Sequence, residues 1–108
     1  MNYSEWTFNE NSPIYIQLCH KLRYSILGGK LLPGETIPSV RNMATMLHLN
    51  VNTVAKTYRL INQDDLIFTQ GKRNYCVTLD TRIYINYASN NANLVVIYFP
   101  CLYLRQKG

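Results

Sequence analysis

Apolar residues recur at intervals of three and four positions in three stretches of the chain, a spacing typical of helices with one buried face. The first predicted helix has Ser12 as its N-cap and Pro13 at its first helical position. It ends at Gly28-Gly29. The second follows Ser39 as N-cap, and the third follows Asn50. The apolar positions are Tyr15, Leu18, Cys19, Leu22 and Ile26, then Val40, Met43, Ala44 and Leu47, then Val54, Tyr58 and Ile61. Two short helices about three residues apart are typical of a helix-turn-helix.

Short β-prone runs surround these helices. Thr36-Ile37 is a candidate for a very short strand, and residues 66–68 and 75–77 flank a basic segment at 70–74, a pattern that predicts a hairpin. The order helix, short strand, helix, helix, hairpin predicts an α+β fold. We expect a winged helix-turn-helix of three helices plus a two- to three-stranded β-wing.

The two ends of the chain are less regular. Trp6 and Phe8 alternate with polar residues and predict either a short strand or a cover over the edge of the core. Residues 81–108 contain no acid and no helical stripe. We therefore predict a DNA-binding domain at 1–80 and a short C-terminal tail at 81–108, a candidate dimerisation segment. Its apolar run at 94–104 is shorter than the roughly 20 residues of a membrane span. A strand packed in a core or dimer explains this run, with a membrane-associated tail as the alternative, and we expect no membrane partner.

Composition limits the classes of function that the chain can have. Its 108 residues, 47% of them hydrophobic, suffice for one small core, and no motif of a common catalytic site is present. We expect no enzyme and no cofactor. We also expect no metal site, because His20 and His48 are isolated in the sequence.

The three cysteines are expected to be reduced thiols. The N-terminus lacks a signal-peptide pattern, which predicts a cytoplasmic protein. The net charge of +5 suits a polyanionic partner without requiring one.

An ordered set of short motifs between Pro13 and Val77 carries a family resemblance. The motifs are Pro13-Ile14-Tyr15, Gln17-Leu18, Pro33-Gly34, Ile37-Pro38-Ser39-Val40-Arg41, Asn50 to Tyr58, Leu66-Ile67 and Gly71. In this order and spacing they resemble the DNA-binding domain of GntR-family regulators, in particular the YtrA-like branch. The resemblance implies a transcriptional regulator, by default a repressor, whose double-stranded operator is a palindrome bound by a homodimer.

The sequence departs from the family pattern at four places. His48 in the turn, Asp65 after the third helix and Arg73 in the wing stand where the family usually has glycine. Histidine tolerates positive φ better than most residues, so we expect the turn to survive. Members of the YtrA-like branch pair through a charged helical C-terminal segment, and residues 81–108 lack that pattern, which leaves the mode of dimerisation open. From its length we expect no larger effector domain, and whether an effector binds stays open.

The third predicted helix carries most of the candidate DNA contacts. If Val54, Tyr58 and Ile61 face the core, the outward face offers Val51, Asn52, Ala55, Lys56 and Arg59. An asparagine such as Asn52 can read an adenine edge, while Thr53 and Lys56 suit phosphates. Tyr15, Tyr24 and Tyr58 are expected to pack in the core. An ordinary solvated helix face is the alternative.

Further candidate contacts precede and follow the third helix. Arg41 beside Ser39 opposes the dipole of its own helix, which indicates either a DNA contact or a surface salt bridge. Gln70, Gly71, Lys72 and Arg73 form a basic wing tip that suits a minor groove, or merely a solubilising hairpin. The full predicted set is Ser39, Arg41, Asn50, Val51, Asn52, Thr53, Lys56, Arg59, Gln70, Gly71, Lys72 and Arg73. The alternative function is a winged-helix protein-interaction module without DNA binding.

Overall fold

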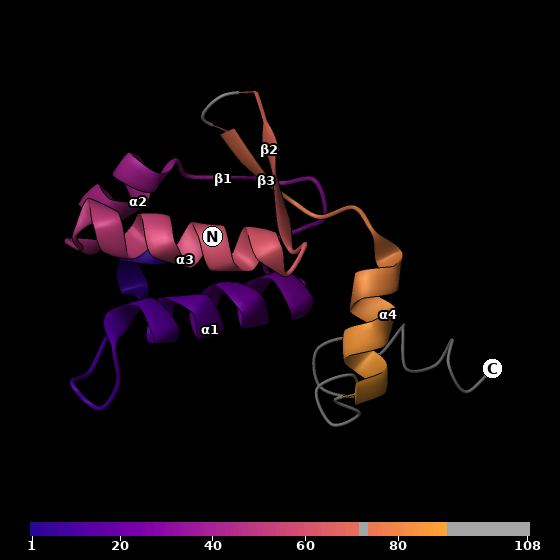
Figure 1. Ribbon diagram of the computed structural model, residues 1–108, viewed down its shortest axis with the longest axis horizontal. Coiled ribbons are helices and arrows are strands. Elements are labelled where there is room, and N and C mark those ends of the chain that lie inside the picture. Colours follow the sequence, from indigo (N-terminus) through magenta and orange to yellow (C-terminus); the bar gives the residue numbers. More distant parts are fainter. Residues whose placement is uncertain (72–73, 91–108) are drawn as a thin grey trace.

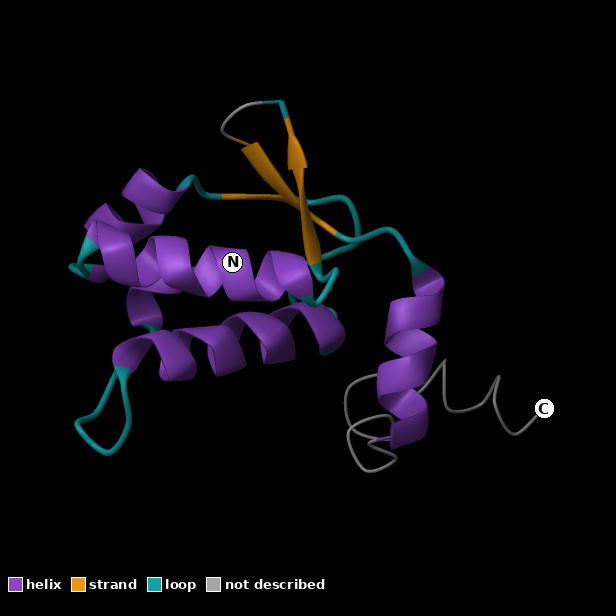
Figure 2. Ribbon diagram, in the orientation of Figure 1, coloured by secondary structure: helices purple, strands orange, loops and turns teal. Residues whose placement is uncertain are grey.

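The computed structural model of the chain describes residues 1–71 and 74–90 (Figures 1 and 2). Its elements are the 3₁₀ helix η1 (Tyr3–Glu5), α1 (Ile14–Leu27), β1 (Thr36–Ile37), α2 (Val40–Leu47), α3 (Val51–Gln63), β2 (Ile67–Gln70), β3 (Asn74–Val77) and α4 (Thr81–Asn90). The three predicted helices and the β-wing are therefore present, and the winged helix-turn-helix architecture is confirmed.

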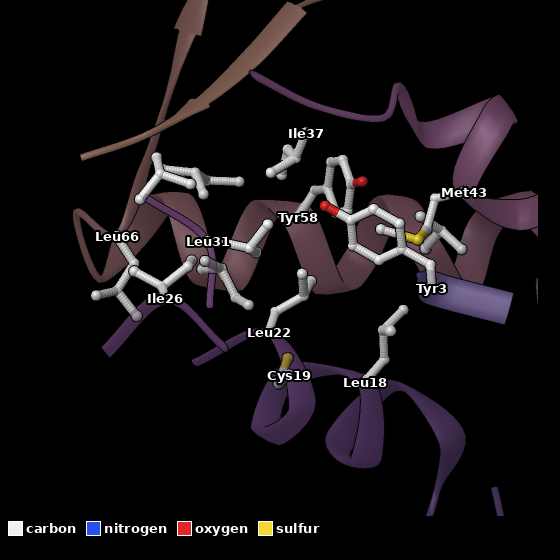
Figure 3. Packing of buried hydrophobic residues seen from close by; sticks show 14 of the residues in the cluster. Tyr3, Leu18, Cys19, Leu22, Ile26, Leu31, Ile37, Met43, Tyr58 and Leu66 are labelled. Carbon is white, nitrogen blue, oxygen red and sulfur yellow. The ribbon is translucent and has the colours of Figure 1, made fainter. Parts of the chain in front are cut away.

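One hydrophobic core joins α1, α2, α3 and the sheet. Helices α1 and α3 lie side by side, with α2 and the strands on the other side of α3 (Figure 1). Leu18, Leu22 and Ile26 on α1 are fully buried, and they point toward Tyr58 and its neighbours on α3 (Figure 3). These are the residues that the helical spacing selected, because a 3.6-residue period places them on one face.

The three strands form one antiparallel sheet in the order β1-β3-β2. Strand β1 pairs Thr36 with Cys76 and Ile37 with Tyr75, so the shortest strand ties the start of the helix-turn-helix to the wing. The hairpin strands extend further toward the tip than predicted, since Gln70 pairs with Asn74. Gly71 directly follows that pair and has φ +78°, a left-handed conformation that glycine adopts without strain.

The segment before α1 covers the edge of the core. Tyr3 is buried with its ring edge against Trp6, at 5.2 Å between centroids, and Trp6 and Phe8 pack as half-buried residues against the core. The alternative of a strand at Trp6 and Phe8 is wrong. Helix α1 begins one residue later than predicted, with Pro13 rather than Ser12 as N-cap, because Pro13 has an extended ψ of 141°.

Tyr24 is a second correction. It was expected in the core, but 47% of its surface is exposed, while Tyr58 is buried and Tyr15 half-buried. Only one face of α1 packs on α3, and Tyr24 lies outside that face.

Helix α4 corrects the expectation that the tail has no helical stripe. The Asp80 side chain accepts a hydrogen bond from the Arg82 backbone N–H at 2.9 Å, which provides an N-terminal cap. One turn further, Ile83 packs against the core and Tyr84 is buried, donating its hydroxyl to the Thr78 carbonyl at 3.1 Å. The predicted apolar run at 94–104 lies outside the described residues.

Cys19 and Cys76 are buried free thiols, as expected, and burial raises the pKa of the Cys19 thiol. Cys101 lies outside the described residues. Within 1–71 and 74–90 no group of His, Cys, Asp and Glu is arranged to hold a metal ion. No helix in the same ranges has the length and apolar character needed to cross a membrane.

Candidate nucleic-acid interface

Side-chain caps and one left-handed residue fix the geometry of the helix-turn-helix. Ser39 Oγ accepts from the Asn42 N–H at 3.2 Å and caps α2, and Asn50 Oδ1 accepts from the Asn52 N–H at 2.8 Å and caps α3. Between the helices His48 has φ 55° and ψ 43°, the left-handed conformation expected at this position. The Leu49 N–H then donates to the Ala44 carbonyl at 2.9 Å, which closes the end of α2.

Helix α3 divides into a buried and an outward face as the sequence predicts. Val54, Thr57, Tyr58 and Ile61 are buried, which directs the opposite side of the helix away from the core. Val51, Asn52, Lys56 and Arg59 are exposed, and Thr53 and Ala55 are half-buried. Val51 keeps 46% of its surface exposed at the first turn of the helix.

Two contacts of Tyr58 hold α3 against the rest of the interface. Its hydroxyl donates to the Pro38 carbonyl, and its ring meets Tyr75 of the wing edge-on at 4.9 Å between centroids. Burial raises the pKa of the Tyr58 hydroxyl far above its usual value. Helix α3, the start of α2 and the wing are therefore connected through one buried side chain.

The helix-turn-helix has an entirely basic charge pattern. Between Glu35 and Asp64 the sequence has no acidic residue, while Arg41, Lys56 and Arg59 are all exposed. Asp64, at the end of α3, is paired with Arg23 of α1. An anion approaching the outward face of α3 thus meets cations without competing carboxylates on the same helices.

Arg41 has no evident role in stability. It is exposed in the first turn of α2, where a cation opposes the helix dipole, and no acidic group of the described residues forms an ion pair with it. The alternative of a surface salt bridge thus finds no partner among residues 1–71 and 74–90.

The wing contributes two described candidates. Gln70 and Gly71 are exposed at the tip of the hairpin, and Gln70 Oε1 accepts from the Cys76 thiol at 3.1 Å. Lys72 and Arg73 lie outside the described residues.

Sequence reasoning missed one neighbour of the outward face. Lys56 Nζ lies 3.8 Å from the centroid of the Tyr15 ring, on the first turn of α1. The two residues are far apart in the sequence, and the helical spacing of Tyr15 indicated only a core residue. No local signal predicts which side chain of α3 its ring will meet.

Comparisons with known proteins agree with this architecture. Residues 14–77 match the family model described as bacterial regulatory proteins, gntR family. The chain is 36% identical over 66 residues to the HTH-type transcriptional repressor YtrA of Bacillus subtilis, covering 60% of this chain and 51% of YtrA. It is 35% identical over 63 residues to the HTH-type transcriptional regulator YhcF of the same organism, covering 58% and 52%. The chain thus spans about half the length of these curated relatives.

Solved structures give the same result. A GntR family transcriptional regulator from Listeria monocytogenes superposes with a TM-score of 0.72 at 25% identity, over 93% of this chain and 88% of that one. YtrA from Sulfolobus acidocaldarius, a GntR-family transcription factor, superposes with a TM-score of 0.62 at 32% identity, over 76% and 92%. The match covers α1 through β3, the part of the chain that holds the helix-turn-helix and the wing. The chain therefore belongs to the gntR family of bacterial regulatory proteins.

Proposed function

We propose that this chain is a transcriptional regulator that binds double-stranded DNA by inserting α3 into the major groove. The observation that carries the proposal is the outward face of α3, which is basic, free of acids and held away from the core by buried residues on its other side. A helix presented in this way by a helix-turn-helix has the diameter and exposure needed to enter the groove.

The first turn of α3 is the proposed site of base recognition. Asn52 can form a bidentate pair with an adenine edge, and the exposed Val51 side chain suits contact with a thymine methyl group. The side-chain oxygens of Asn50 and Ser39 accept cap hydrogen bonds, so these residues would contact DNA through their remaining donors, the Asn50 amide NH₂ and the Ser39 hydroxyl.

The exposed cations of α2 and α3 are the proposed phosphate contacts. Arg41, Lys56 and Arg59 are exposed on both helices of the motif, and the Thr53 hydroxyl is short enough to suit a phosphate better than a base. Gln70 and Gly71 of the wing, together with Lys72 and Arg73 from the sequence, are proposed to approach the minor groove.

The proposed mode of action is repression by a homodimer on a palindromic operator in the cytoplasm. The B. subtilis relative YtrA is a repressor, which supports this assignment. Two recognition helices would occupy successive major grooves about 34–36 Å apart. In this proposal residues 1–80 bind DNA and the segment from 81 onward, beginning with α4, pairs the subunits.

Footprinting on the DNA upstream of the chain's own coding region tests the proposal, with sedimentation to measure the mass in solution. We expect a protected palindrome, a dimer, and affinity that falls steeply with salt concentration. Absence of binding to any duplex at low ionic strength would contradict the proposal and favour the protein-interaction alternative.

A further inference from the structure

The contact between Tyr15 and Lys56 joins the first turn of α1 to the proposed DNA-binding face of α3. The Lys56 ammonium lies 3.8 Å from the ring centroid, well within the range over which the face of an aromatic ring attracts a cation. Lys56 forms no ion pair with an acid among residues 1–71 and 74–90. The Tyr15 ring is thus the group that defines where this ammonium lies.

The backbone that carries the ring contacts both α3 and the preceding loop. The buried Thr57, next to Lys56 on α3, donates its hydroxyl to the Thr53 carbonyl at 3.0 Å, and the Tyr15 carbonyl lies at 3.4 Å as a second, longer acceptor of the same hydroxyl. The segment before α1 is closed by Gln17, whose amide donates to the carbonyls of Asn9 at 2.9 Å and Ser12 at 2.7 Å. Gln17 Oε1 also accepts from the Asn9 N–H at 3.0 Å. Tyr15 therefore sits on a backbone that is fixed both against α3 and against the preceding loop.

A ring beneath an ammonium does not consume its hydrogen-bonding capacity. Lys56 is exposed, and a lysine has three N–H donors, so those not directed at the ring can reach a phosphate. Fixing the side chain in advance lowers the conformational entropy that a flexible lysine loses on binding.

We propose that Tyr15 is a positioning residue for DNA binding, holding Lys56 at the α1 side of the recognition helix so that its ammonium meets a backbone phosphate beside the groove. The inference rests on the proposed function and extends the interface to α1. Tyr15 itself is not assigned a base or phosphate contact.

A double-mutant cycle tests this role. Wild type, Y15L, K56M and the double variant are titrated against a labelled duplex of about 30 base pairs, long enough for two half-sites, at about 50 mM salt. Because a phosphate contact does not depend on sequence, a duplex of random sequence serves. Y15L should weaken binding about two- to five-fold in the wild-type background and have no effect in the K56M background. Y15F, which retains the ring, should bind like wild type.

A readout in the free protein separates positioning from loss of fold. The Lys56 side-chain protons next to the ammonium should show an upfield ring-current NMR shift that Y15F keeps and Y15L loses, with the other amide resonances preserved. Equal losses from Y15L in both backgrounds, or tighter binding by Y15L, would overturn the inference while leaving the proposed function intact. A wild-type chain that binds no duplex would overturn both.

Discussion

The hydroxyl of Tyr58 on α3 donates a hydrogen bond of 2.6 Å to the backbone carbonyl of Pro38, directly before the N-cap of α2. Tyr58 is 1% exposed, so the carbonyl is satisfied from within the protein at this point. The bond ties α3 to the segment that carries Ser39 and Arg41. Both proposed contact elements therefore keep a fixed relative position before any DNA arrives.

Removal of this hydroxyl tests how much the link contributes. Y58F keeps the ring against Tyr75 but leaves the Pro38 carbonyl without its donor, which should lower the free energy of unfolding by about 1–3 kcal/mol. Urea unfolding measures the change. The control is Y24F at an exposed tyrosine, where we expect a change within about 0.5 kcal/mol. Equal effects of the two variants would contradict a role for the Pro38 bond.

Buried tyrosines should make the fold sensitive to alkali. Burial raises the pKa of Tyr3 to about 12, with a smaller contribution from the Glu35 charge, and burial raises the pKa of Tyr84 to about 12. In the unfolded chain a tyrosine ionises near pH 10. Stability from these groups is therefore fully present below about pH 10 and is lost as the pH rises toward about 12, because the unfolded state releases protons first.

Urea midpoints at about pH 9 and about pH 11 measure this loss. Y3F removes one of the shifted hydroxyls and should show a smaller decline between the two pH values than wild type. An identical decline in both proteins would show that Tyr3 contributes nothing to the alkaline transition.

The helix-turn-helix was predictable because its signals are local. Ser39 and Asn50 are strong caps, Val54, Tyr58 and Ile61 repeat with the helical period, and the structure uses all five as expected. The same reasoning failed where local preference was weak. Pro13 rather than Ser12 precedes α1. Helix α4 escaped prediction because Ile83 and Tyr84, which face the core, are adjacent in the sequence and so show no helical spacing.

The positive φ of His48 was a prediction of a different kind, since it came from the family resemblance, in which glycine is usual at this position. The structure gives it φ 55°. Replacement by glycine should relieve backbone strain of about 1–2 kcal/mol in the folded state. Glycine also loses more conformational entropy on folding, which costs about 0.5–1 kcal/mol, so H48G should raise the free energy of unfolding by about 0.5 kcal/mol. H48V, with a β-branched side chain that disfavours positive φ, should destabilise by about 1–3 kcal/mol. Thermal unfolding should rank the midpoints Gly, His, Val, and any other order would contradict a strained turn.

Side-chain contacts across elements could not be predicted in the same way. The sequence marked Lys56 as outward but gave no indication that Tyr15 lies beneath it, because the register of α1 against α3 is set by packing of the whole core. The sequence likewise did not indicate whether an acidic residue pairs with Arg41. In the described residues no carboxylate forms an ion pair with it.

Asn50 allows folding and binding to be separated. Its side-chain oxygen caps α3, and aspartate is an equally good cap that adds a negative charge. N50D should therefore unfold within about 0.5 kcal/mol of wild type, whereas N50A should lose about 1 kcal/mol. Duplex binding should weaken in N50D, because the new charge lies among the proposed phosphate contacts. Wild-type affinity in N50D, measured by fluorescence anisotropy, would exclude Asn50 from the interface.

Asn52 is the proposed reader of a base, and its role predicts a change in specificity rather than in general affinity. N52A removes an exposed amide whose side chain is not needed for the cap, since Asn50 bonds to the Asn52 backbone N–H. The fold should be unchanged, and discrimination at one base position of the operator should fall by about 1–3 kcal/mol. Binding to a library of single-base operator variants measures this directly. N62A, also exposed but at the far end of α3, is the matched control and should leave every preference unchanged. Equal losses by N52A on operator and random duplexes would assign Asn52 to the DNA backbone, because a phosphate contact weakens all sequences alike.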